Sequence, residues 1–163
     1  MYKTILFSAF LFLFLINGNP QAQTKAPSLK PLQLGIIKED RSKETSAFNG
    51  CGCTLFRNRQ EQRKQQVIFL SDMSENALIN LNGKDLVLRL IDSSPEKKRR
   101  EKIGDRRWEI FKAGNTQLRV DYTISNLCDT KDESCEAIYY KAILTLTRNE
   151  QKIVANTIGA CGC

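Results

Sequence analysis

The sequence of 163 residues contains no histidine. This absence excludes catalytic sites built on an imidazole, such as the Ser-His-Asp and Cys-His arrangements, together with zinc sites that use histidine and a histidine pH switch. The nine glycines are scattered, and none forms the spacing of a phosphate-binding loop. An enzyme with this sequence would have to use carboxylates, lysines, tyrosines or thiols.

Long apolar runs are also missing, except at the N-terminus. There the run Ile5–Ile16 has 12 residues, which is too short to span a bilayer, and it follows the basic residue Lys3. Helix-breaking residues 17–20 and the small residue Ala22 come next. This pattern is typical of a secretory signal peptide. We therefore expect residues 1–22 to be removed, and the mature protein to be periplasmic or secreted without a transmembrane segment.

Removing 22 of the 163 residues leaves 141, a length that suits one domain with its own core. Residues 23–49 are rich in Lys, Ser, Thr and Pro, which predicts a flexible leader with a candidate edge strand at Leu32–Ile37. Residues 50–163 are expected to form a single disulfide-stabilised β domain.

Short apolar segments separated by turn signals follow residue 50. The alternation is clearest at Leu118–Ile124, where every second residue is apolar, and Asn82-Gly83 is a strong hairpin signal. Short connections favour neighbouring strands, so we predict an all-β fold, an antiparallel meander of about eight strands forming a small barrel or sandwich. The predicted strands are Thr54–Arg57, Val67–Ser71, Ala77–Leu81, Leu86–Ile91, Trp108–Lys112, Leu118–Ser125, Ile138–Thr147 and Ile153–Ile158.

Six cysteines in an exported chain favour a disulfide framework. Cys128 and Cys135 flank one predicted connection, so we expect them to pair. The others form two Cys-Gly-Cys units, whose sulfurs would share one face of a strand because residues two apart point the same way. If the first and last strands are antiparallel, Cys51 pairs with Cys163 and Cys53 with Cys161. These bonds would close the fold, with Gly52 and Gly162 leaving space where strands come close.

The Cys-Gly-Cys units also allow two other interpretations. Their four sulfurs could bind Zn²⁺ or Cu(I) as thiolates, although one residue between ligands is tighter than in familiar zinc sites. A disulfide within one unit could act in redox chemistry, although neither unit precedes a predicted helix that would lower a thiol pKa. Structural disulfides are favoured, and a thiol-based metal-binding or redox protein is the alternative.

The formal net charge of +7 equals the combined excess of two stretches. Arg57–Lys64 has an excess of +3 and Glu96–Arg107 an excess of +4. The second stretch precedes an aromatic residue, and such a combination can hold sulfate or phosphate groups while the ring stacks on a sugar or base. A solvated loop is the alternative, and Trp108 itself is expected in the core or at a barrel end. The candidate binding residues are Lys97, Lys98, Arg99, Arg100, Lys102, Arg106, Arg107 and Trp108.

One segment resembles a known family. Trp108-Glu109-Ile110-Phe111-Lys112-Ala113-Gly114, followed by Leu118, is similar to part of the bacterial periplasmic lysozyme inhibitors. The similarity covers about a dozen residues, and the Ser-Gly loop characteristic of that family is not recognisable. The resemblance implies only a class of protein, namely a small exported barrel with a positive surface. It implies no role for any residue.

These features lead us to expect an exported binding or interaction module that is not an enzyme and has no cofactor or metal. Its expected partner is an anionic polysaccharide of the cell envelope or an acidic protein, in an inhibitor-like mode if the resemblance holds, rather than nucleic acid. A hydrolase built on unrecognised carboxylates is a third hypothesis. It is the least favoured of the three, because no pair of carboxylates stands out as catalytic.

Overall fold

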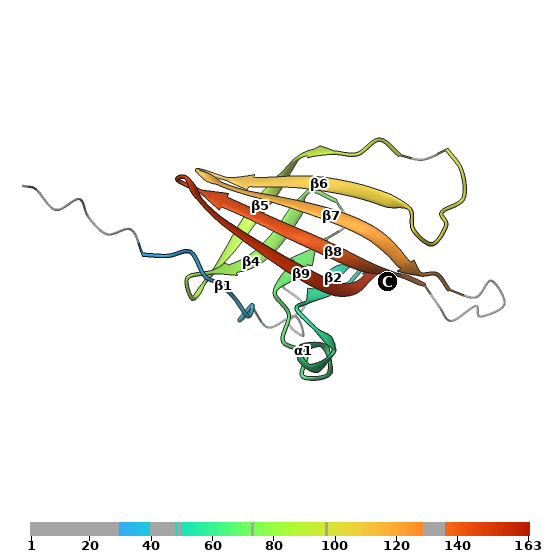
Figure 1. Cartoon of the computed structure of the whole chain (residues 1–163), viewed down its shortest axis with the longest axis horizontal. Helices are drawn as coiled ribbons and strands as arrows, with labels where there is room; N and C mark the ends of the chain where they lie inside the picture. The colour runs from blue at the N-terminus through green and yellow to red at the C-terminus, as the bar shows by residue number, and fades with distance from the viewer. Residues whose placement is uncertain (1–29, 40–47, 49, 73, 97, 129–135) are drawn as a thin grey trace, which may run out of the picture.

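The computed structural model describes residues 30–39, 48, 50–72, 74–96, 98–128 and 136–163. The predicted signal peptide, much of the leader, Lys97 and Cys135 lie outside these residues. Strands dominate the described part, with one short helix (Figure 1). The elements are β1 (Leu34–Gly35), β2 (Gly52–Phe56), α1 (Arg59–Arg63), β3 (Phe69–Ser71), β4 (Asn76–Leu81), β5 (Lys84–Ser93), β6 (Arg106–Ala113), β7 (Thr116–Asn126), β8 (Ala137–Arg148) and β9 (Gln151–Gly162).

The strands form a closed barrel of eight antiparallel strands with one extra strand. The order is β4-β3-β2-β9-β8-β7-β6-β5, and the pairing of β4 with β5 closes the ring. The short β1 pairs with β4 beside β3, within the segment where an edge strand was expected. The predicted all-β meander is therefore confirmed, and its form is a barrel.

Tight turns join the long hairpins. Asn82 and Gly83 have φ of 52° and 83°, and Asn149 and Glu150 have φ of 46° and 59°. Positive φ at both central residues matches the twist of a two-residue hairpin, which explains the asparagine at the first position of each turn. The hairpin predicted at Asn82-Gly83 is confirmed.

Alternate residues of the strands fill the barrel. In β7 and β8 the side chains of every second residue are buried, while their neighbours face outward. This is the expected consequence of the two-residue period of a strand with one face on a core. The buried residues of these two strands include Leu118, Val120, Tyr122, Ile124, Tyr140, Ala142, Leu144 and Leu146.

Strands β3 and β4 are buried on both faces. Their outward residues Leu70 and Leu78 belong to a second apolar cluster with Phe48 and Phe56, against which Ile37 packs. The Ile37 N–H also donates to the Val67 carbonyl at 2.8 Å. Part of the leader therefore lies on the barrel wall, and the continuous apolar runs of β3 and β4 follow from burial on both sides.

The short helix α1 leaves the barrel after β2. Asn58 caps it, because its side chain accepts the Glu61 N–H at 2.9 Å. Arg57 then pairs with Glu61 at 3.0 Å, one turn away, and also donates to the Leu34 carbonyl. The cap and the ion pair hold the helix against β2 and the leader.

Two disulfides tie the first barrel strand to the last. Cys51 pairs with Cys163 and Cys53 with Cys161, with Cα–Cα distances of 4.1 Å and 4.0 Å. The β2–β9 register places Cys53 opposite Cys161. The predicted pairing is confirmed, so these sulfurs are not free thiols. Cys128 is also disulfide-bonded, while its expected partner Cys135 lies outside the described residues.

The glycine of each Cys-Gly-Cys unit leaves space for a neighbouring chain. A Cβ atom on Gly52 would overlap the Ser71 carbonyl oxygen of β3, and one on Gly162 would overlap the Glu136 carbonyl oxygen before β8. The expected close approach is confirmed. It is made with the strands flanking the β2–β9 pair, rather than between β2 and β9 themselves.

We expect the two closing disulfides to stabilise the barrel non-additively. They span 112 and 108 residues, so each closes nearly the same loop. Replacing only the exposed pair, Cys51 and Cys163, with serine should cost less than about 1 kcal/mol, whereas replacing all four cysteines should cost about 4 to 5 kcal/mol. Denaturant unfolding of the variants measures both values. Equal losses from each bond that add up to the total would contradict this account.

Candidate functional site

A cleft opens at the end of the barrel that carries the disulfides. The last residues of β3, β5 and β7 and the first residues of β4, β6 and β8 lie at the same end. The cleft has a volume of about 620 Å³ and reaches from the β5–β6 connection into the barrel. Its wall contains Ser71, Leu90, Phe111, Ile124 and Tyr140. Polar side chains of β6 form the deepest charged part of this site.

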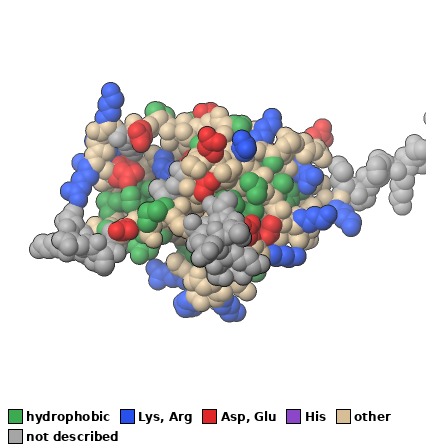
Figure 2. All heavy atoms as spheres, turned by 180° about the vertical axis from the view of Figure 1, so that it is seen from behind, with side chains coloured by type: hydrophobic (Ala, Val, Ile, Leu, Met, Phe, Trp, Pro, Cys, Tyr) green, Lys and Arg blue, Asp and Glu red, His purple; other side chains and the backbone are tan. Residues whose placement is uncertain are grey.

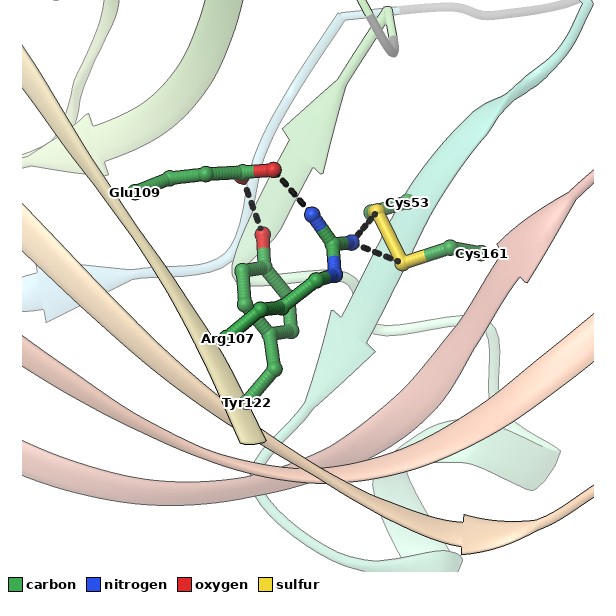
Figure 3. The surroundings of a disulfide bond; sticks show 5 residues. All are labelled: Cys53, Arg107, Glu109, Tyr122 and Cys161. Atoms are coloured by element: carbon green, nitrogen blue, oxygen red, sulfur yellow. Dashed lines mark hydrogen bonds and ion pairs between the residues drawn. A yellow bond between two sulfur atoms is a disulfide. The ribbon is translucent and has the colours of Figure 1, made fainter. Parts of the chain in front are cut away.

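Arg107 and Glu109 form an ion pair inside the barrel mouth (Figure 3). They are two residues apart on β6, so both point to the inner face. Arg107 Nη1 donates to Glu109 Oε1, and the Tyr122 hydroxyl donates to Glu109 Oε2 at 2.8 Å. The side chains of Arg107 and Glu109 are 30% and 16% exposed. Both carboxylate oxygens are therefore engaged at a partly buried position.

Arg107 also contacts the inner disulfide. Its Nη2 lies 3.5 Å from Cys53 Sγ and 3.3 Å from Cys161 Sγ (Figure 3). Its Cζ atom lies 4.1 Å from the centre of the Tyr122 ring and 5.2 Å from that of Tyr140. Cation–π contact and hydrogen bonding thus connect β6 to β2, β7, β8 and β9 through one guanidinium group.

The net effect of burial and neighbouring charges is to raise the pKa values of Arg107, Tyr122 and Tyr140. Burial by itself lowers the pKa of Arg107, but Glu109 and the two tyrosines outweigh it and the net shift is upward. Burial, with a contribution from Glu109, raises the pKa of Tyr122 well above its usual value. At neutral pH the cluster contains a charged guanidinium and neutral phenols.

The predicted basic residues do not stay together. Lys98, Arg100 and Lys102 are exposed on the β5–β6 connection. Arg99 is exposed too, but it donates to both oxygens of Asp105 at 2.9 Å and 2.6 Å. The cations of this connection are therefore partly used to hold it in place.

Two predicted residues lie elsewhere than expected. Arg107 points into the barrel instead of joining the basic surface. Trp108 lies on the outer face, near the start of β6, where Arg119 packs 4.8 Å from the ring centre. Of the two places predicted for it, the core is therefore wrong, and the barrel end stays a prediction. The cause is the phase of β6, in which Phe111 is buried and residues 107 and 109 share its face. The apolar pair Trp108 and Ile110 suggested the opposite phase.

Glu109 and the roles of Tyr122 and Tyr140 were not predicted from the sequence. The inward phase of both tyrosines was apparent from the alternation of β7 and β8. The β6–β7 register, which sets Arg107 opposite Tyr122, was the missing information. For the charged part of the site, the only signal in the sequence was that Arg107 and Glu109 are polar residues two positions apart in a predicted strand.

Comparison of the chain with protein-family models, with curated proteins and with solved structures gives no match. The resemblance to lysozyme inhibitors therefore stays a prediction. Within the described ranges, no three acidic or cysteine side chains gather as a metal site. No helix of that part of the chain is long and apolar enough to cross a membrane.

We expect Arg107→Met to destabilise the protein by about 2 to 3 kcal/mol, because Glu109 loses its counter-charge. The loss stays below that of a fully buried pair, since both side chains are partly exposed. Adding Glu109→Gln should recover about 1 kcal/mol or more in a double-mutant cycle measured by urea unfolding. Strictly additive losses would show that the pair is not coupled.

Asp72, the residue that follows β3, makes the stability of the protein depend on pH. Burial alone would raise its pKa, but hydrogen bonds from Asn76 and Ser74 outweigh burial and lower the pKa from 3.8 to about 2. Its contribution is present above about pH 4 and is lost as the pH falls towards 2. The stability difference between wild type and Asp72→Asn, measured by urea unfolding, should shrink over that range. A difference that stays constant down to about pH 2 would contradict this assignment.

Proposed function

We propose that the protein is an exported, non-enzymatic binding module that holds an anionic polysaccharide through the β5–β6 connection. The observation that carries the proposal is the exposure of Lys98, Arg100 and Lys102 on a connection that is fixed in place. Lysine and arginine side chains in fixed positions bind a polyanion with a smaller loss of conformational entropy than those of a free loop.

Asp105 organises this connection. It accepts the side chain of Arg99 and, at 2.9 Å, the backbone N–H of Lys102. The Gly104 N–H donates to the Ile124 carbonyl at 2.9 Å, and the Ile124 N–H donates to the Asp105 carbonyl at the same distance. The C-terminal half of the connection is thereby tied to β7.

The other end of the connection is tied to β6. The Ser94 N–H donates to the Trp108 carbonyl at 2.8 Å, and the Trp108 N–H donates to Ser94 Oγ at 3.1 Å. Both ends are thus bonded to the barrel wall, which supports a defined position for the cations between them.

The charge distribution favours a polymer over a compact acidic protein. Glu96, Glu101 and Asp105 interrupt the cations of the connection. On the face shown in Figure 2, lysines and arginines lie mostly near the margins, with acidic and hydrophobic side chains between them. Separated cations suit a ligand with repeated charges, because several weak contacts add through the chain.

Two features support export. Disulfides persist in oxidising compartments, and four cysteines of this chain form the bonds that close the barrel. The apolar run Ile5–Ile16 has the length and setting of a signal peptide. The thiol-based alternative needs either free sulfurs or a disulfide within one Cys-Gly-Cys unit, whereas these sulfurs are bonded between the two units.

A charge-matched pair of variants tests the proposal. Lys98→Gln, Arg100→Gln and Lys102→Gln are combined in one protein, and Lys84→Gln, Lys112→Gln and Lys152→Gln in the other. The second set lies in exposed positions at or near the opposite end of the barrel. On a dextran sulfate column, the first variant should elute at clearly lower salt than the second. Equal shifts would show that only net charge matters and would overturn the proposal.

A further inference from the structure

A groove crosses the outer wall of the barrel, on the face of the sheet opposite to the side chains of Arg107 and Glu109. It has a volume of about 1040 Å³ and lies over β6, β7, β8 and β9. The segment Ser94–Glu96 lines one side and Arg57 lines the other. The groove therefore runs across the strands and is bounded at both ends.

Apolar side chains form much of its floor. Trp108, Ile143 and Ile158 line it, and Ile143 is 44% exposed. Next to this floor, Val154 is 55% exposed. The outer face of β3 and β4 offers a contrast, because its leucines are covered by residues of the leader. The apolar residues over β8 and β9 have no such cover among the described residues.

Two uncompensated cations stand beside the apolar floor. The strand register places Arg106 and Lys141 on either side of Thr123, so they are two strand spacings, roughly 10 Å, apart. Among the described residues, the side chain of neither forms an ion pair or a hydrogen bond. Two acids line the same groove. Asp121 is already held by Arg119 at 2.7 Å, and Glu96 lies on the side formed by Ser94–Glu96. An acidic group placed over Thr123 would be within reach of both long cationic side chains.

We propose that this groove binds a single-chain amphiphile with an acidic head group. The tail lies on Trp108, Ile143 and Ile158, and the head lies between Arg106 and Lys141. From β6 to β9 the groove crosses three strand spacings, roughly 14 Å, so a tail of intermediate length is required. The walls at both ends favour a single molecule over a flat bilayer. This inference goes beyond the proposed function and does not depend on Lys98, Arg100 or Lys102.

The chain supplies its own probe, because Trp108 is its only tryptophan. Dodecanoate, added below its micelle concentration, should shift the Trp108 emission in a saturable way with one site per chain. Hexanoate and inorganic phosphate at the same concentrations should leave the emission unchanged, because one lacks the tail length and the other the tail. Uncharged dodecyl maltoside should bind more weakly than dodecanoate.

Variants test the floor and the head site separately. Ile143→Asp should weaken dodecanoate binding by about tenfold or more. Val87→Asp is the matched control, since Val87 is 50% exposed on the outer face of β5 and away from the groove. Lys141→Gln should weaken dodecanoate binding but leave dodecyl maltoside unaffected. Circular dichroism melts check that each variant is folded. If Ile143→Asp does not fold, Lys141→Gln still tests the proposal.

Several outcomes would overturn the inference. These are an emission that does not saturate with dodecanoate, equal effects of Ile143→Asp and Val87→Asp, an unchanged affinity in Lys141→Gln, and a response seen only with phosphatidylglycerol vesicles. The variant lacking the cations of the β5–β6 connection should bind dodecanoate as the wild type does. Failure of polysaccharide binding and failure of amphiphile binding are thus separate results.

Discussion

The pairing of β2 with β9 is the contact on which the rest of the structure depends. It joins segments more than 100 residues apart, so its formation orders a long loop and is entropically costly. The Cys53–Cys161 and Cys51–Cys163 bonds offset that cost, and Gly52 and Gly162 allow the flanking chains to approach closely. Without this pairing β2 and β9 would both have an open edge, and neither the mouth nor the outer groove would have its present shape.

Closure also explains why the barrel has a polar end and an apolar body. Arg107 reaches the inner disulfide only because β2 and β9 meet opposite β6 (Figure 3). Tyr122 and Tyr140 then cover the guanidinium, and Glu109 balances its charge. Most of the remaining inward positions are apolar and fill the interior, with Ser71, Thr116 and Thr157 as buried polar exceptions. The closed barrel presents the two features on which the proposals rest, the cations of the β5–β6 connection and the groove across β6 to β9.

Much of the fold could be predicted from the sequence, for specific physical reasons. The two-residue alternation in β7 and β8 gave their inward faces, Asn82-Gly83 gave a hairpin, and the Cys-Gly-Cys units gave both the pairing and the register of the closing strands. The site was harder to predict. Trp108 and Ile110 suggested the wrong phase for β6, so Arg107 was placed outside. The groove combines residues of four strands, and only the register shows that Arg106 and Lys141 flank Thr123. The packing of Ile37 and Phe48 on the outer face of β3 and β4 could not be predicted either, because it depends on contacts between residues distant in sequence.

Native-state hydrogen exchange before and after reduction of the disulfides tests the role of closure most directly. If β2–β9 pairing is held by the two bonds, reduction should first remove protection from the amides shared by β2 and β9. The amides of the β6–β7 and β7–β8 ladders, which are joined by local hairpins or short connections, should keep their protection longer. Uniform loss of protection across all strands, or unchanged protection at β2 and β9, would contradict the account.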